Sequence, residues 1–197
     1  MKIILASASP RRREILHRYH LDFQVIKADI DESMLEQESP IDLVKRLSFE
    51  KGMFVAKKNN NDLVISADTI VVLNDKILGK PLNRLEAFEM ISSLSNKKHK
   101  VITGFSLINL SNNKIINDFV VTEVKFKKLT DKNINDYLDT GEYVDKAGAY
   151  GIQGYGALLV ESIEGDFFNI VGFPISKVSD LLRSEFHIDL LKQEHFL

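Results

Sequence analysis

The stretch that most constrains the fold of this chain runs from Leu63 to Leu73 and reads LVISADTIVVL. Its β-branched and apolar residues occupy both alternating faces, which is typical of a strand buried on two sides. We therefore expect this strand near the centre of a sheet. Asp68 interrupts the run, and a carboxylate there needs a partner, a metal ion or a functional reason. Asp68 is thus the best single catalytic candidate; the alternative is a strand end where it hydrogen-bonds a loop.

The segments around this stretch alternate between strand and helix patterns. Segments with the pattern of a strand occur at 3–6, 23–26, 101–110, 115–129 and 158–163. Helix starts are indicated by a proline or a capping residue at Pro10, Pro40, Pro81, Thr130 and Pro174. Residues 111–113, Ser-Asn-Asn, predict a hairpin turn. The alternation predicts a mixed α/β fold in a single domain over residues 1–197, with two lobes around a cleft.

Composition excludes several classes of protein. The chain has no cysteine, which rules out disulfides and thiolate chemistry and fits a reducing compartment, so we expect a cytoplasmic protein. Apolar runs are shorter than the roughly 18 residues of a membrane helix. The formal net charge of -2 argues against stable nucleic-acid binding, and we interpret the basic run 97–100 as a solvated loop, with RNA contact as the alternative. The five histidines lack zinc-ligand spacing: His17, His20, His99, His187 and His195.

Three arginines follow the helix start at Pro10. With Ser9 as the cap, Arg11, Arg12 and Arg13 fall in the first turn, where each cation costs about 0.3–1 kcal/mol against the helix dipole. A bound phosphate would resolve this conflict through the dipole, the free N–H groups and the guanidinium forks together. The alternative is that the arginines extend into solvent or pair with carboxylates at little cost.

Other charged residues are ambiguous on their own. Asp29, Asp31 and Glu32 form an acidic loop that offers oxygen ligands for Mg²⁺, or is merely solvated. Lys51 lies on a helix, and Lys80 lies in a Gly-Lys-Pro turn that lacks the P-loop pattern. Gln153, in the only glycine-rich segment, could hydrogen-bond a base edge or a backbone group.

Five motifs occur together and in a fixed order. They are Ser7-Ala8-Ser9-Pro10-Arg11-Arg12, Ala67-Asp68-Thr69, Gly79-Lys80-Pro81, the block DKAGAYGIQG at 145–154, and Gly172-Phe173-Pro174. In order and spacing this set resembles the Maf family of nucleotide pyrophosphatases over residues 1–184. The ten-residue block is its most specific part. Phe173 and the extra Arg13 depart from the commonest pattern, but both lie outside the implied chemistry.

The resemblance implies a fold and a reaction. The fold would be similar to that of inosine triphosphatases: a long, twisted mixed sheet flanked by helices, with a nucleotide cleft between two lobes. The reaction would split the α–β phosphoanhydride of a nucleoside triphosphate into monophosphate and pyrophosphate, with Mg²⁺ or alternatively Mn²⁺. By position, Asp68 is implied as the general base or a metal ligand, and Glu32 as a further metal ligand. The implied substrate-binding residues are Ser7, Arg11, Arg12, Lys51 and Lys80.

Three positions resemble the pyrimidine-acting branch of the family: Arg11 after Pro10, Thr69 after Asp68, and Gln153. They imply dTTP and UTP as substrates, with modified pyrimidine nucleotides as further candidates and a house-cleaning role in nucleotide metabolism. A homodimer is usual in the family. Arrest of cell division is a further role that the resemblance implies. The alternative is a regulator of septum formation that binds nucleotide without significant hydrolysis.

Overall fold

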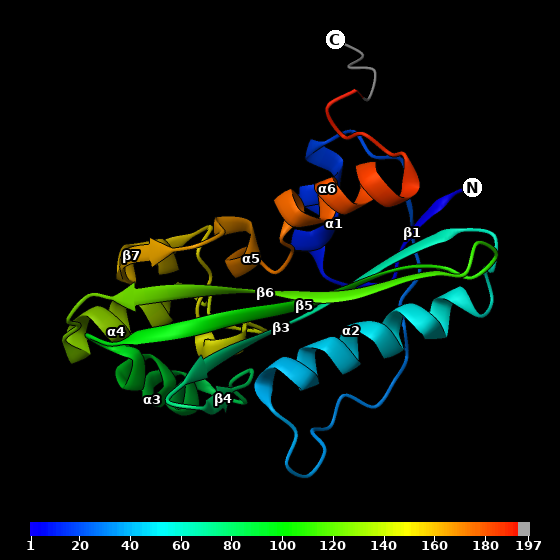
Figure 1. The fold of residues 1–197 in the computed structure, drawn as a ribbon. Coiled ribbons are helices and arrows are strands. Elements are labelled where there is room, and N and C mark those ends of the chain that lie inside the picture. The colour runs from blue at the N-terminus through cyan, green and yellow to red at the C-terminus, as the bar shows by residue number, and fades with distance from the viewer. Residues whose placement is uncertain (193–197) are drawn as a thin grey trace. The chain divides into compact units, whose positions relative to one another are not determined.

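The computed structural model describes residues 1–192 and contains a mixed, seven-stranded sheet (Figure 1). Its strands are β1 (Ile3–Leu5), β2 (Gln24–Val25), β3 (Leu63–Leu73), β4 (Lys76–Leu78), β5 (Lys98–Asn109), β6 (Lys114–Phe126) and β7 (Val160–Glu164). The strand order is β2-β1-β3-β5-β6-β7, and β4 pairs with β3. β1 runs parallel to β2 and β3, whereas the β3–β4 and β6–β7 pairs are antiparallel. The predicted mixed α/β fold is confirmed.

The helix starts predicted at Pro10, Pro40, Thr130 and Pro174 are confirmed to within one residue, whereas the helix expected at Pro81 begins at Arg84, because Asn83 is its N-cap and accepts the Glu86 N–H. The helices are α1 (Pro10–Arg18), α2 (Pro40–Ala56), α3 (Arg84–Leu94), α4 (Asp131–Asp139), α5 (Phe167–Val171) and α6 (Ile175–Phe186), with short 3-10 turns η1 (Ala147–Ala149) and η2 (Tyr155–Leu159). Ser39 Oγ accepts a hydrogen bond from the Asp42 N–H at the start of α2, and Thr130 forms a capping box with Asn133. The short helix α5 has no counterpart among the predicted elements.

The prediction for the apolar stretch 63–73 is confirmed. It is β3, an interior strand between β1 and β5, and its side chains are buried on both faces. Asp68 lies in the middle of β3 and is 8% exposed. The alternative that it lies at a strand end is therefore wrong, and its charge must be satisfied inside the fold.

Two other predictions need correction. β5 begins at Lys98 and His99 is 2% exposed, so the run 97–100 is not a solvated loop. Alternation explains the error, because on a strand the lysines on either side of His99 face outward while His99 faces the core. The strand expected at 158–163 begins later, at Val160, because η2 extends to Leu159. His195 lies outside the described residues.

The chain divides into two compact units. The first comprises residues 1–68, 103–119 and the chain from Gly172 onward; the second comprises 69–102 and 120–171. Each unit has an apolar cluster of its own. The cluster of the first unit contains Ile4, Ala6, Val55, Ala56, Val64 and Ile108. The cluster of the second unit is built around Phe126, Ile91, Leu94, Tyr137 and Tyr150. The assignment of 1–197 as a single domain stays a prediction.

No helix within residues 1–192 is long and apolar enough to cross a membrane.

Candidate active site

The start of α1 holds its second arginine in a defined position. Ser9 is the N-cap residue, but its side chain makes no capping hydrogen bond. Instead the Ser9 N–H donates to Ser7 Oγ (3.2 Å), and Arg12 Nη1 donates to the same hydroxyl (3.0 Å). Arg12 Nε donates to the carbonyl oxygen of Gly172 (2.8 Å). Phe173 and Pro174 separate Gly172 from the start of α6. Arg12 therefore does not extend freely into solvent.

The acceptors of these two hydrogen bonds are both neutral oxygens. Burial lowers the pKa of Arg12, and the negative charge of Asp68 opposes that shift. Arg11 lowers the same pKa further and Glu32 raises it. The guanidinium thus lies within electrostatic reach of the two carboxylates predicted to hold a metal ion. Arg11 is half-buried beside it, whereas Arg13 is exposed.

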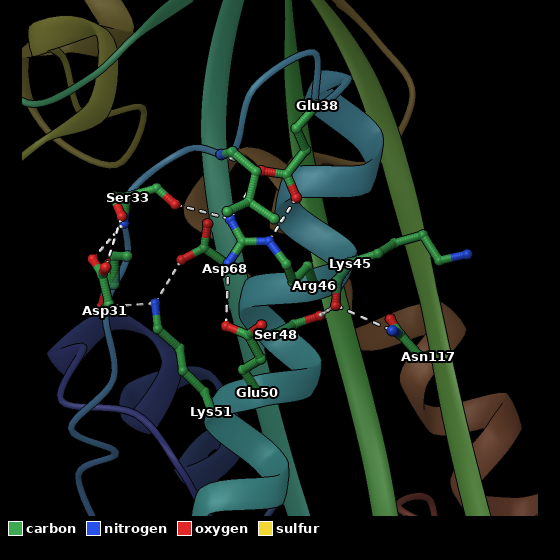
Figure 2. Close-up of polar contacts among 12 residues, drawn as sticks. Asp31, Ser33, Glu38, Lys45, Arg46, Ser48, Glu50, Lys51, Asp68 and Asn117 are labelled. Atoms are coloured by element: carbon green, nitrogen blue, oxygen red, sulfur yellow. Dashed lines mark hydrogen bonds and ion pairs between the residues drawn. The ribbon is translucent and has the colours of Figure 1, made fainter.

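Asp68 forms a buried ion pair with Lys51. Lys51 Nζ lies 2.7 Å from Asp68 Oδ1, and the two side chains are 11% and 12% exposed. Lys51 comes from α2, which lies close to the sheet at Gly52: a Cβ there would lie 2.7 Å from Ser66 Oγ and Ile108 Cδ1. Glycine at position 52 thus lets α2 approach closely beside the lysine. The ambiguous Lys51 of the sequence is placed in the candidate site (Figure 2).

Glu32 completes a three-residue ionic cluster. Its Oε1 lies 3.0 Å from Lys51 Nζ, and its side chain is 60% exposed. Asp31, by contrast, accepts hydrogen bonds from the N–H (2.9 Å) and hydroxyl (2.8 Å) of Ser33, which lower the pKa of Asp31. Of the acidic loop, therefore, Glu32 reaches Lys51, whereas Asp31 is engaged within the loop.

The Asp68 and Glu32 carboxylates suit a hard divalent cation. Both approach the Lys51 ammonium group, so the two carboxylates lie close to each other. Residues 1–192 contain no group of three or more acidic or histidine side chains arranged as metal ligands. Mg²⁺ is commonly held by one or two carboxylates together with substrate phosphates, and this pair fits that pattern.

The second unit contains the other predicted residues. Lys80 and Gln153 are exposed, and Thr69 is half-buried. The Gly148 N–H donates to the carbonyl of Gly79 (3.0 Å), which joins the Gly-Lys-Pro turn to the DKAGAYGIQG block. Gly148 has φ of +67°, and a Cβ there would lie 3.0 Å from the Val71 side chain. A glycine is required at this junction because other residues would be both strained and crowded.

Sequence reasoning missed Glu142, which organises the segment around Gln153. Its carboxylate accepts the N–H groups of Tyr155 (2.6 Å) and Gly156 (3.2 Å). A Cβ at Gly154 would overlap this carboxylate. Closely spaced glycines signal the close approach of another group, but the sequence does not say which group approaches.

The comparison with protein families decides the assignment. The sequence matches the family described as Maf-like protein over residues 2–185. The chain belongs to the Maf family. The resemblance at residues 1–184 is thereby confirmed.

Several relatives of this Maf protein carry the same name. It is 58% identical over 190 residues to the "dTTP/UTP pyrophosphatase" of Clostridioides difficile (strain 630), covering 96% of this chain and 98% of the relative. It is 53% identical over 192 residues to the protein of that name from Thermoanaerobacter sp. (strain X514), covering 97% and 100%. The match with "The structure of the Staphylococcus aureus Ham1 protein" has a TM-score of 0.46 at 16% identity, over 64% of this chain and 72% of that one.

Proposed function

We propose that this Maf protein hydrolyses dTTP and UTP to the nucleoside monophosphate and pyrophosphate. The observation that supports this most is the cluster of Asp68, Lys51 and Glu32, with Arg12 held nearby. The relatives named dTTP/UTP pyrophosphatase supply the substrate class. Modified pyrimidine nucleotides and a house-cleaning role belong to the same proposal.

We assign to Asp68 the role of orienting or deprotonating the attacking water. The ammonium of Lys51 engages Oδ1, so Oδ2 is the oxygen that would orient the water or accept its proton. Water would attack the α-phosphorus in line with the bond to the bridging oxygen between the α- and β-phosphates, and pyrophosphate would leave with the electron pair of that bond. Because β3 fixes the backbone of Asp68, the carboxylate can be held in the geometry that the attack requires.

Lys51 and Arg12 would stabilise the phosphate charge. An ammonium has three N–H donors, and two of those on Lys51 point to carboxylates, which leaves one for a phosphate oxygen. Ser7 and Gly172 accept hydrogen bonds from Arg12 and so orient its guanidinium, and an arginine side chain stays protonated in proteins. Arg11 would add a second guanidinium at the same helix start. These cations would offset the charge on the departing pyrophosphate.

In the alternative role of Asp68, its carboxylate and that of Glu32 would hold Mg²⁺, or Mn²⁺ in its place. When bound, such an ion supplies charge neutralisation and polarises phosphate oxygens. The family resemblance assigns Lys80 to phosphate binding, and Thr69 and Gln153 to pyrimidine selection. A cytoplasmic location and a homodimer are further parts of the proposal, supported by that resemblance.

Pyrophosphate release from a panel of common and modified nucleoside triphosphates tests the proposal. We expect release from dTTP and UTP in preference to purine nucleotides. We expect Asp68→Asn to lower kcat by about 10²–10⁴-fold, the usual contribution of a positioned general base, while nucleotide binding persists. Asp75→Asn is the matched control, since Asp75 lies in the turn after the same strand with φ of +63°, a conformation that asparagine tolerates.

The outcomes separate the alternatives. Full turnover in Asp68→Asn would exclude Asp68 as base or essential ligand. Nucleotide binding by the wild-type protein without pyrophosphate release would favour the regulator of septum formation instead.

A further inference from the structure

The segment that carries Glu32 is an irregular connection between β2 and α2. Residues 31–37 are exposed, and the Glu32 side chain itself is 60% exposed. An ion pair this exposed contributes little stability by itself. It does not offset the conformational entropy that an otherwise unattached loop loses when it becomes ordered. Glu38, near the end of the segment, is different, because its side chain is only 7% exposed.

Arg46 of α2 binds this segment through a planar fork. Its Nε donates to Glu38 Oε1 (2.6 Å) and its Nη2 to Glu38 Oε2 (2.8 Å), the bidentate geometry that arginine forms with a carboxylate. The pairing raises the pKa of Arg46, and the same hydrogen bonding lowers the pKa of Glu38. Nη1 contacts Glu50, one turn further along α2 (3.1 Å). Figure 2 shows the guanidinium of Arg46 between these groups.

A further contact of Arg46 reaches the backbone next to Glu32. Its Nη2 donates to the carbonyl oxygen of Ser33 (2.9 Å). The Ser33 N–H and hydroxyl are in turn bound by the carboxylate of Asp31. Glu32 therefore lies between two residues that are hydrogen-bonded to each other, and one of these is fastened to α2.

The same helix holds both ends of this arrangement. α2 carries Arg46, which anchors the backbone beside Glu32, and Lys51, which binds the Glu32 carboxylate at 3.0 Å. Lys51 also binds Asp68. A shift of the loop away from α2 would withdraw Glu32 from the cluster while leaving the Lys51–Asp68 pair in place.

We propose that Arg46 is a positioning residue: through its fork with Glu38 and its bond to Ser33, it fastens the Glu32-bearing loop to α2 and so holds Glu32 at the Lys51–Asp68 pair. The effect of Arg46 on turnover rests on the proposed function. Lysine cannot replace arginine here, because an ammonium keeps the charge but cannot make the planar two-bond contact to Glu38 while also reaching Ser33.

Hydrogen–deuterium exchange of residues 29–38 tests the loop directly and requires no turnover. We expect Arg46→Lys to accelerate exchange at least threefold in this segment. Glu50→Gln is the matched control, because Glu50 contacts the same guanidinium from within α2 and not from the loop. Unchanged exchange in Arg46→Lys, or equal acceleration in Glu50→Gln, would overturn the proposal.

A double-mutant cycle tests the link to Glu32. We expect Arg46→Lys to lower kcat/KM for dTTP by about tenfold, the effect of one lost charge-assisted contact. In a Glu32→Gln background we expect Arg46→Lys to have almost no further effect, because the residue through which it acts is already removed. A general loss of stability would instead lower activity equally in both backgrounds, and that result would refute the link.

Two provisions keep these tests decisive. Should Arg46→Lys fail to fold, Glu38→Gln removes the partner of the fork while leaving the arginine, and the same two measurements apply. A wild-type protein that released no pyrophosphate would refute the proposed function, whereas the exchange measurement would still decide whether Arg46 fastens the loop.

Discussion

At the scale of single residues, the candidate site depends on charges whose partners are distant in sequence. Arg12 is held by Ser7, five positions away, and by Gly172, 160 positions away. Lys51 and Asp68 are 17 positions apart and bury each other's charge. Removing one member of such a pair leaves an uncompensated buried charge, which is more costly than losing the pair itself.

Arg12→Lys tests the role of the Arg12 guanidinium. Lysine keeps the charge but cannot bind Ser7 and Gly172 together, so the cation would lose its orientation. We expect kcat/KM for dTTP to fall by about 10–100-fold, corresponding to the 1.5–3 kcal/mol of a hydrogen bond from a charged group. Arg13→Lys, the same change at the exposed neighbour, should have little effect. Equal losses in the two variants would contradict the assignment.

Burial of His99 should make the stability of the second unit sensitive to acid. Its Nε2 lies 2.8 Å from the Tyr150 hydroxyl, and burial lowers the pKa of His99 to about 4 from its usual 6.5. Between these values the unfolded chain binds a proton that the folded chain does not, so stability falls as the pH drops from 6.5 toward 4. The shift corresponds to a loss of about 3 kcal/mol.

Thermal unfolding between pH 7 and pH 4.5 measures this effect. We expect His99→Gln to show a weaker dependence of Tm on pH than the wild type, whatever its stability at pH 7. His17→Gln, at an exposed position on α1, should keep the wild-type dependence. An unchanged slope in His99→Gln would show that His99 is not the group responsible.

At the scale of elements, the site depends on how closely α2 packs on the sheet. A Cβ at Gly104 on β5 would overlap the backbone carbonyl of Val44 on α2. Backbone atoms cannot turn aside as a flexible side chain can, so the helix would have to move. Lys51 and Arg46 would move with it, and the glycine thus supports the position of both.

Gly104→Ala should therefore destabilise the protein. We expect a loss of roughly 1–3 kcal/mol or more from overpacking, seen as a lower midpoint in denaturant unfolding. Gly79→Ala is the control for stability, because a Cβ at Gly79 meets nothing within 4 Å. A Gly104→Ala protein as stable as the wild type would mean that α2 can shift without cost.

At the scale of the whole molecule, the described apolar clusters of the two units consist of hydrophobic side chains, whose burial requires no metal ion. The cluster in the first unit is built from aliphatic side chains of β1, α2, β3 and β5 together with Ala6, which follows β1. The fold and the proposed metal dependence should therefore be separable.

Removal of divalent cations tests that separation. We expect chelation with EDTA to abolish pyrophosphate release while shifting Tm by no more than a few degrees. Adding Mg²⁺ together with a non-hydrolysable dTTP analogue should raise Tm, because a ligand that binds only the folded state stabilises it. Undiminished turnover in EDTA would contradict the role proposed for Glu32 and Asp68 as metal ligands.

Local patterns in the sequence determined most of the elements, because capping residues and hydrophobic periodicity act over a few positions. Ser9, Ser39 and Thr130 mark helix starts that the structure confirms, and the apolar stretch 63–73 is the interior strand. The same patterns misjudged the run 97–100, where pairing with the sheet outweighed a strongly charged composition.

The sequence by itself also identified Asp68 as an anomaly and, through its motifs, the Maf family. Only the tertiary structure decided which charges meet: that Lys51 is buried against Asp68 and Glu32, and that Arg12 is oriented by a carbonyl. It likewise revealed Arg46 and Glu142 as anchors of two loops. The physical reason is that ion pairs and close packing join positions that are far apart in the chain. The identity of a charged residue does not show whether the folded chain pairs it with a carboxylate or leaves it in water.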